Sequence, residues 1–278
     1  SLSYIEYLID DFIELHGDRN WGDDPSIIIG IGTLEDIPVA IIGQEKGRTD
    51  KEREQRRFGM ARPEGYRKAL RMMKLAEKFK IPLLTFIDTP GAYPGFESEQ
   101  RGIAMALARC SSTMSSLPIP IICSVIGEGG SGGALSLSVG DIILMQENAI
   151  FSVISPEGAA SILWGDADKA RDIASALRLT APDLLKLGII DEIVPEPVGS
   201  AHMDFRTAAV SLKSYILYHL GQLGKKSASR LLSERYDKYE SIGITGHYWQ
   251  QLIKHEIRQA LDAAKEKMGK MIHHREKH

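Results

Sequence analysis

Residues 119–140 read IPIICSVIGEGGSGGALSLSVG, and this stretch decides the expected fold. An apolar run over 121–126 precedes five glycines in the seven positions 127–133. Alanine, leucine and serine then resume as a short helical pattern. Glycine lets the backbone approach a ligand closely and adopt a positive φ. A strand that ends in such a loop before a helix aims several backbone N–H groups at one point, which suits an anion or a developing oxyanion.

Strand and helix patterns alternate on both sides of this stretch, and the alternation predicts an α/β fold. Two apolar runs within 26–45 are separated by Glu35 and Asp36, which predicts a hairpin. Residues 1–16 carry apolar side chains at helical spacing and are expected to form one helix. The other expected elements are helices over 66–80, 98–116, 156–178, 180–188, most of the chain beyond 200 and a charged segment at 247–272, and strands over 81–87, 142–146, 150–154 and 189–194, with a Pro/Gly loop at 88–96.

The composition excludes several classes of function. The chain has 278 residues, of which 43% are hydrophobic and 26% charged, as in ordinary globular proteins. A net charge of −3 gives no global reason for a nucleic acid or an anionic membrane as partner. No apolar run approaches the about 18–20 residues of a membrane span. Cys110 and Cys123 cannot make a four-cysteine zinc site, so we expect no metal in this chain. We expect both cysteines to be small, buried residues with reduced thiols, as in a cytoplasmic protein.

The glycine stretch also fits a dinucleotide-binding pattern. Gly127, Gly129 and Gly132 match G-x-G-x-x-G, and Glu147 lies where a ribose ligand is expected. However, the following helix would be very short, and about 120 residues precede a motif that normally opens its domain. A phosphate-binding P-loop is set aside because no Gly-Lys-Ser/Thr follows.

Two further interpretations use the same residues. Gly129, Ser131 and Gly133 match G-x-S-x-G of serine hydrolases, with Asp191 and His202 as candidate partners. The chain has eight histidines, so such a pairing is easy to find. The alternative is an oxyanion hole made of backbone N–H groups without a side-chain nucleophile. Spacing alone does not separate these hypotheses.

Longer strings carry a resemblance to a known family. PEGYRKAL (63–70), FIDTPGAYPG (86–95) and SVISPEGAASILW (152–164) resemble the alpha subunit of bacterial acetyl-CoA carboxylase carboxyltransferase. The resemblance covers roughly 4–242 and implies a crotonase-like (ClpP/crotonase) α/β spiral of ββα units with helical N- and C-terminal segments. We therefore expect a carboxyltransferase domain at 1–242 and a C-terminal helical extension at 243–278.

The resemblance also implies an activity and its partners. The family transfers a carboxyl group from carboxybiotin, held on a biotin carboxyl carrier protein, to acetyl-CoA, and the malonyl-CoA formed serves fatty acid synthesis. The implied partners are a zinc-ribbon beta subunit, in an assembly of two alpha and two beta chains, and biotin carboxylase. The beta subunit would hold the CoA thioester. This division agrees with the lack of zinc-ligand cysteines here.

By the same resemblance, the backbone amides of Gly132 and Gly133 form the oxyanion hole on the alpha side. Residues 46–71 hold ten Lys/Arg against four Asp/Glu, which favours a surface that attracts CoA phosphates or an acidic partner. The expected cofactor-binding residues, from these arginines and the glycines nearest the site, are Gly91, Gly95, Gly129, Gly130, Arg56, Arg57 and Arg62.

Some features depart from the family pattern. Residues 99–116 read EQRGIAMALARCSSTMSS, where the family more often has a Gly-Gln-Ser run and charged residues. Family members carry an N-terminal helical region that this sequence does not include, and 243–278 extend past the usual end. Another acyl-CoA as substrate, a stand-alone crotonase-type hydratase or thioester hydrolase, and a regulatory subunit without chemistry stay open as alternatives.

Overall fold

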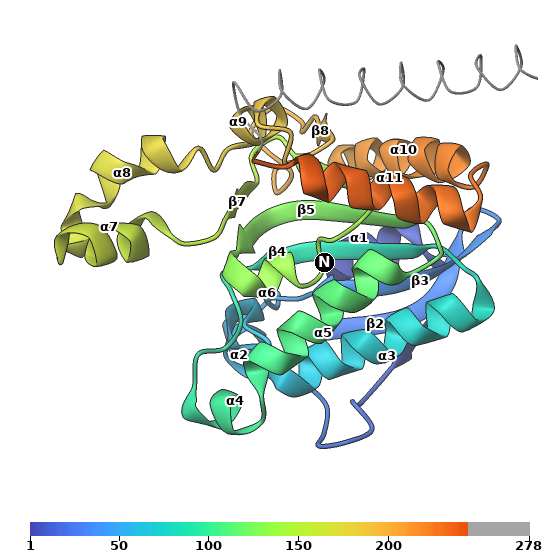
Figure 1. The fold of residues 1–278 in the computed structure, drawn as a ribbon, viewed down its shortest axis with the longest axis horizontal. Helices are drawn as coiled ribbons and strands as arrows, with labels where there is room; N and C mark the ends of the chain where they lie inside the picture. Colours follow the sequence, from blue (N-terminus) through green and yellow to red (C-terminus); the bar gives the residue numbers. More distant parts are fainter. Residues whose placement is uncertain (244–278) are drawn as a thin grey trace, which may run out of the picture. The chain divides into compact units, whose positions relative to one another are not determined.

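One eight-stranded sheet runs through the described part of the chain (Figure 1). The structure is a computed structural model, and it describes residues 1–243. The strand order is β1-β2-β3-β4-β5-β6-β8, with β7 paired to β5. The strands are β1 (Asp10–Leu15), β2 (Ile27–Leu34), β3 (Ile37–Gln44), β4 (Leu83–Thr89), β5 (Ile121–Gly130), β6 (Ile142–Gln146), β7 (Ile150–Ser152) and β8 (Glu192–Val194).

The sheet changes from antiparallel to parallel at β3. The hairpin of β2 and β3 is confirmed, with Leu34 opposite Ile37 and Ile27 opposite Gln44. From β3 onward, every neighbouring pair of strands is parallel. The carboxyl ends of β3, β4 and β5 therefore meet at one edge of the sheet, where α/β proteins commonly bind ligands.

Helices cover both faces of the sheet. The α-helices are α1 (Leu2–Leu8), α2 (Asp50–Gln55), α3 (Pro63–Phe79), α4 (Phe96–Gln100), α5 (Ile103–Ser116), α6 (Ser131–Leu135), α7 (Pro156–Trp164), α8 (Ala170–Leu177), α9 (Ala181–Lys186), α10 (Phe205–Leu223) and α11 (Ala228–Ser241), and the 3-10 helices are η1 (Arg57–Gly59) and η2 (Ala167–Lys169). One core cluster joins α3 and α5 to the sheet, and another joins α1, α10 and α11 to it.

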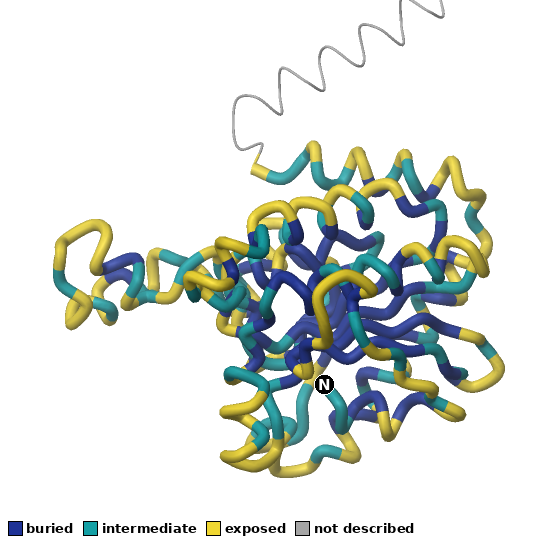
Figure 2. The backbone as a smooth tube through the Cα atoms, turned by 90° about the horizontal axis from the view of Figure 1, so that it is seen from below, coloured by how far each residue is buried: buried dark blue, intermediate teal, exposed yellow. Residues whose placement is uncertain are grey.

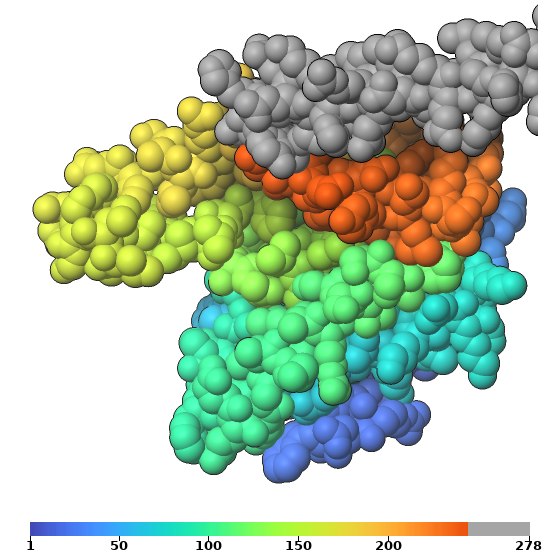
Figure 3. Space-filling model, in the orientation of Figure 1, coloured from blue at the N-terminus to red at the C-terminus, as the bar shows by residue number. Residues whose placement is uncertain are grey.

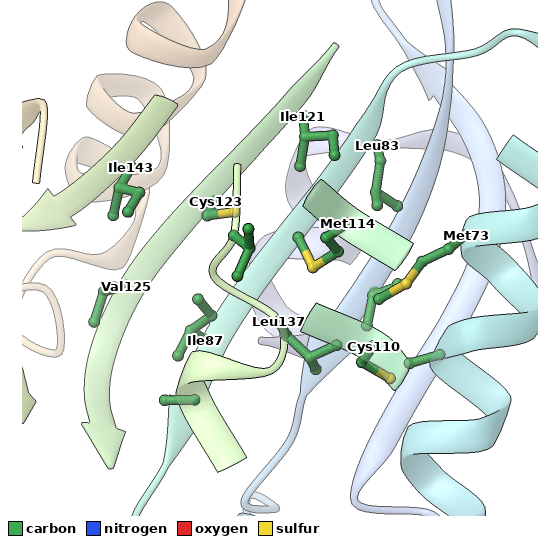
Figure 4. Packing of buried hydrophobic residues seen from close by; sticks show 14 of the residues in the cluster. Met73, Leu83, Ile87, Cys110, Met114, Ile121, Cys123, Val125, Leu137 and Ile143 are labelled. Carbon is green, nitrogen blue, oxygen red and sulfur yellow. The ribbon is translucent and has the colours of Figure 1, made fainter. Parts of the chain in front are cut away.

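The core cluster that joins α3 and α5 to the sheet includes residues next to the glycine segment. Figure 4 shows Met114 of α5 next to Leu83 and Ile121 of the central strands, and Cys110 of α5 next to Leu137, all within this cluster. Because the central parallel strands are covered on both faces, they are almost entirely apolar. This explains why their sequences read as largely hydrophobic runs, with the buried Thr85 and Ser124 as exceptions, rather than as alternating patterns.

Three predicted helices are wrong in extent, and two of them lie in the first half of the chain. The expected helix over 1–16 ends at Leu8, and 10–15 form the edge strand β1 because they pair with β2, with Ile13 opposite Ile31. The expected helix over 98–116 is interrupted at Gly102, whose φ of 77° is left-handed and separates α4 from α5. In the first helix, pairing with a strand that is distant in the sequence overrides the local helical pattern. In the second, a single residue with a left-handed φ does so.

α7, η2 and α8 form an arm that extends away from the sheet (Figure 1 and Figure 2). The predicted helix over 156–178 is broken at Gly165, which has a φ of 68°. Its predicted start is confirmed, since the Ser155 hydroxyl accepts a hydrogen bond from the Gly158 N–H at 3.1 Å. The arm has a small buried cluster of its own, made of Ala159, Ala160 and Ile173.

Within residues 1–243, no helix combines the length and the apolar character needed to cross a membrane. The charged helix predicted over 247–272 and nearly all of the predicted extension at 243–278 lie outside the described residues.

Candidate active site

The glycine stretch belongs to a strand for longer than predicted. β5 continues to Gly130, because Gly129 pairs with Thr89 on one side and with Phe151 of β7 on the other. The expected loop after residue 126 is therefore wrong, and the chain passes directly from β5 into α6. The change of direction is concentrated at Ser131, a non-glycine residue with a φ of 52°. Such a conformation costs free energy and is often found at functional sites.

Close packing requires glycine at three positions, two of them against the backbone that follows β4. A β-carbon on Gly130 would lie 2.1 Å from the Pro90 carbonyl oxygen, and one on Gly133 would lie 2.5 Å from the Ala92 nitrogen. A β-carbon on Gly129 would lie 2.6 Å from the Phe151 ring. The loop after β4 is therefore pressed against the start of α6.

Gly132 differs from its neighbours. The nearest atom to a β-carbon placed there is Leu107 Cδ1 at 3.5 Å, an ordinary contact. The first four N–H groups of a helix have no partner within the helix. Accordingly, neither the Gly132 nor the Gly133 N–H donates a hydrogen bond to another residue of the described range. Two adjacent amides in the first turn of α6 are thus without a hydrogen-bond partner among the described residues, with Gly132 partly exposed and Gly133 buried.

A cavity of about 290 Å³ lies beside this turn. Its walls are mainly apolar and come from α6, β7, the end of α8, α9 and the residues that follow α9. It is lined by Ser131, Gly132, Leu135, Phe151, Ser152, Val153, Leu177, Leu184 and Ile189. Gly132, whose N–H has no partner among the described residues, is therefore part of the wall of a space large enough for a small ring or a short apolar chain.

The structure brings Gly91 to this site but not Gly95. A β-carbon on Gly91 would lie 3.7 Å from the Ser131 β-carbon, and the Gly91 N–H is fixed by the Thr89 hydroxyl at 3.1 Å. Gly95 precedes α4, and a β-carbon there would meet the Tyr93 ring at 2.5 Å. Gly95 therefore shapes the turn around Tyr93 rather than the wall of the cavity.

The three predicted arginines have unequal freedom to bind a ligand. Arg57 pairs with the buried Asp24 and also donates to the Ser26 hydroxyl at 3.0 Å and the Met60 carbonyl at 3.2 Å, so its guanidinium is used within the protein. Arg56 donates to the Pro25 carbonyl. Arg62 lies 5.2 Å from the Tyr93 ring centre, where it can make a cation–π contact, and its ion pair with Glu97, the one it forms within residues 1–243, is long at 3.4 Å.

An ion-paired cluster that the sequence did not reveal lies beside β5. Lys46 Nζ is 3.0 Å from Asp88 Oδ1 and 2.7 Å from Glu128 Oε2. Burial alone would lower the pKa of Lys46, but the two carboxylates outweigh burial and raise that pKa. Asp88 also accepts the Glu128 N–H at 3.0 Å, so the cluster supports the last residues of β5. Its only sequence signal is three charged residues near the carboxyl ends of adjacent strands.

The described structure does not bring together the residues that the serine hydrolase and dinucleotide hypotheses require. His202 contacts Ser200 and Asp191 pairs with Lys238, so neither is hydrogen-bonded to Ser131 in the described structure. Two glycines of the G-x-G-x-x-G match lie inside β5, and the next helix is a single turn of five residues. Glu147 accepts the Glu196 N–H at 3.3 Å.

Solved structures share the fold of this chain. Transcarboxylase 12S matches with a TM-score of 0.66 and 19% identity, over 81% of this chain and 41% of that chain. The Pseudomonas malonate decarboxylase hetero-tetramer in complex with coenzyme A matches with a TM-score of 0.65 and 17% identity, over 87% of this chain and 93% of that chain. The fold is that of the crotonase-like carboxyltransferases, as predicted.

Sequence relatives identify the family within this class. The model of the family "Acetyl co-enzyme A carboxylase carboxyltransferase-like" matches residues 1–243. The acetyl-coenzyme A carboxylase carboxyl transferase subunit alpha of Hydrogenovibrio crunogenus is 55% identical over 242 residues, which are 87% of this chain and 76% of that protein. The same subunit of Bacillus cytotoxicus is 54% identical over 243 residues, 87% of this chain and 75% of that protein. The chain belongs to this carboxyltransferase family.

Proposed function

We propose that this chain acts as the alpha subunit of an acetyl-CoA carboxyltransferase. It transfers the carboxyl group of carboxybiotin to acetyl-CoA and so forms malonyl-CoA for fatty acid synthesis. The observation that carries the proposal is the pair of unbonded amides at Gly132 and Gly133, in a chain that is 55% identical to a named alpha subunit. No residue of this chain serves as nucleophile or as proton donor in the proposed reaction.

The cavity fits the ring system of biotin. A biotin ring is largely apolar with one polar ureido edge, and the cavity of about 290 Å³ is largely apolar with the Gly132 amide at its edge. Carboxybiotin supplies a carboxyl group on a ureido nitrogen, and its departure leaves negative charge near the ureido oxygen. The Gly132 and Gly133 N–H groups donate hydrogen bonds to this oxygen. One such donor typically lowers the barrier by about 3–4 kcal/mol.

Close packing prepares the two amides before the ligand arrives. Gly129, Gly130 and Gly91 hold the backbone around α6 in place without side chains that would fill the approach. Because these positions are fixed by packing, the donors need not reorganise during the reaction. We assign Gly129, Gly130 and Gly91 to this supporting role and Gly132 and Gly133 to direct contact with the ligand.

Arg62 is the candidate for contact with a phosphate or an acidic carrier. Its side chain is 30% exposed, it lies against Tyr93, and its one ion pair is weak. Arg56 is a second candidate, whereas Arg57 and Gly95 support the neighbouring loops.

The reaction needs a second site, because negative charge also develops on the thioester of acetyl-CoA. We assign that site to a zinc-ribbon beta subunit, in an assembly of two alpha and two beta chains. Biotin carboxylase and the biotin carboxyl carrier protein supply the carboxyl group, and we place the system in the cytoplasm.

The arm formed by α7, η2 and α8 is the surface that we assign to the beta subunit. Ile162, Leu163 and Trp164 of α7 are 76%, 62% and 46% exposed. The arm buries only three residues of its own, and Figure 3 shows it standing clear of the surface made by α4 and α5. Val153 and Leu177, at the base of the arm, line the cavity. A partner on the arm would therefore also lie next to the two amides.

The test is reconstitution with and without the beta subunit. Carboxyl transfer is measured in reverse, from malonyl-CoA to free biotin, and transfer is expected only when both subunits are present. Transfer by this chain alone would contradict the shared site. Hydration or hydrolysis of a thioester without biotin would favour the stand-alone crotonase-type enzyme, and faster transfer with another carboxyacyl-CoA would change the assigned substrate.

A further inference from the structure

Gln44 connects the sheet to the candidate oxyanion hole. It is the last residue of β3 and is fully buried, and its Nε2 donates a hydrogen bond to the Gly133 carbonyl oxygen at 2.8 Å. The two residues are 89 positions apart in the sequence. This contact therefore ties the edge of the sheet to the turn that carries the two amides.

The Gly133 carbonyl needs a donor from a side chain. α6 has five residues, and the last carbonyls of a helix find no partner within it. The Ser136 N–H bonds to Gly132 and the Leu137 N–H bonds to Ala134, so neither serves Gly133. In the part of the chain that is described, Gly133 accepts from Gln44 Nε2 and from the Ser136 hydroxyl at 3.1 Å.

The two donors differ in which parts of the structure they connect. Ser136 directly follows α6 and moves with it, so its hydroxyl cannot fix the orientation of α6 relative to the sheet. Gln44 is part of β3, so its hydrogen bond can fix the orientation of α6 relative to the sheet. At Gly133 itself, the backbone at Gly91 and Ala92 limits how closely α6 can approach. Packing thus sets the distance of α6 from its neighbours, and the Gln44 bond restrains its rotation.

We propose that Gln44 is a positioning residue for carboxyl transfer, which aims the Gly132 and Gly133 amides through its bond to the Gly133 carbonyl. This inference rests on the role proposed above for those amides. Removing the bond leaves a buried carbonyl with one donor and lets α6 turn. A displacement of about 1 Å at a reacting centre can lower the rate about 100-fold. Most of the cavity wall comes from β7, α8, α9 and the residues next to them rather than from α6, so the loss should fall mainly on kcat.

Gln146 provides a matched control. It is also a buried glutamine that ends a strand, and its Nε2 donates one hydrogen bond, to Tyr4 Oη at 2.6 Å. Both glutamines have an Oε1 without a hydrogen-bond partner among the described residues. Gln44→Met and Gln146→Met therefore each lose one buried hydrogen bond, and only the first loses a contact to α6.

The experiment compares these variants in the complex with the beta subunit, by the reverse transfer from malonyl-CoA to biotin. Gln44→Met is expected to lower kcat tenfold or more with KM for biotin within twofold, while Gln146→Met keeps kcat within twofold at a similar loss of Tm. Unchanged kcat for Gln44→Met overturns the inference, and so does an equal loss of kcat in both variants.

A third variant separates this inference from the function it rests on. Gly132→Ala places a methyl group next to the amides in a position that the fold can accommodate. If Gly132→Ala lowers kcat and Gln44→Met does not, only the positioning role fails. If Gly132→Ala leaves kcat unchanged, the assignment of the amides fails as well.

Discussion

Arg235 and Asp141 form a buried two-pronged ion pair. Arg235 Nε donates to Asp141 Oδ1 and Nη2 donates to Oδ2, both at 2.9 Å, and the two side chains are 1% and 5% exposed. The remaining guanidinium hydrogens are used by the carbonyls of Met114, Leu117 and Ile119. These hydrogen bonds attach α11 to the end of α5 and to the residues that precede β5 and β6.

We expect Arg235→Met to lower the free energy of unfolding by about 3–5 kcal/mol, because it leaves Asp141 charged and buried without its partner. Arg235→Lys keeps the charge but not the planar fork, so part of the loss should remain. Urea unfolding of each variant measures the change. A loss below about 1 kcal/mol in Arg235→Met would show that α11 contributes little to the stability of the sheet.

Two adjacent glycines are expected to respond in opposite ways. Gly133→Ala forces a β-carbon to within 2.5 Å of backbone atoms and should cost about 3 kcal/mol or more, the upper end of overpacking penalties. Gly132→Ala meets no close contact, and alanine is the better helix former, so its stability should be unchanged or higher.

In Gly132→Ala, activity should not follow stability. Gly132→Ala is expected to fold normally and yet lose about tenfold or more of kcat with the beta subunit, because its methyl group keeps an oxyanion from the amides. Thermal unfolding and reverse carboxyl transfer check the two halves of the prediction. The assignment of the site is wrong if Gly132→Ala is stable and fully active.

Much of the fold could be predicted from local patterns. The β2–β3 hairpin and α3 follow from apolar periodicity and turn residues, and α9 follows from Pro182 and Gly188. Strand pairing could not be predicted in the same way. Residues 128–130 stay in β5 because β7 pairs with all three and Thr89 of β4 pairs with Gly129, and 10–15 become a strand beside β2.

The candidate site was predicted in part. Gly132 and Gly133 came from the resemblance to a family, and the tight packing of Gly130 and Gly133 agrees with the need for glycine. Gln44 and the cluster around Lys46 were missed, because each acts through residues more than about forty positions away. No short-range pattern encodes such contacts.

The stability of the protein should fall in acid partly through Asp23. Burial tends to raise the pKa of Asp23, but hydrogen bonds from Lys68 and the Gly17 N–H lower it to about 2. A carboxylate with a lowered pKa stabilises the fold above its unfolded pKa of about 3.9, and this contribution is lost as the pH falls through 2.

Asp23→Asn should therefore be less stable than the wild type at pH 7 and should show a smaller loss of stability between about pH 4 and pH 2. Urea unfolding at several pH values measures both effects. Lys68 is fully buried and keeps the Asp24 carbonyl as a partner in the variant, so unfolding at pH 7 should remain cooperative. Parallel pH profiles of variant and wild type would exclude Asp23 as a source of acid sensitivity.

The exposed apolar face of α7 should determine affinity for the beta subunit. Leu163 is 62% exposed on the arm, and Ile13 is 67% exposed on the edge strand β1, so Leu163→Asp and Ile13→Asp remove similar exposed apolar surface at different places. Loss of a central apolar contact at an interface commonly costs more than 1 kcal/mol. An added charge there costs more, since it must be desolvated. We expect Leu163→Asp to weaken binding at least tenfold in a titration with the beta subunit, with little change in the Tm of the isolated chain.

Ile13→Asp should bind as the wild type does. Equal affinities for the two variants would place the interface elsewhere, whereas weaker binding by Ile13→Asp alone would move it to the β1 edge.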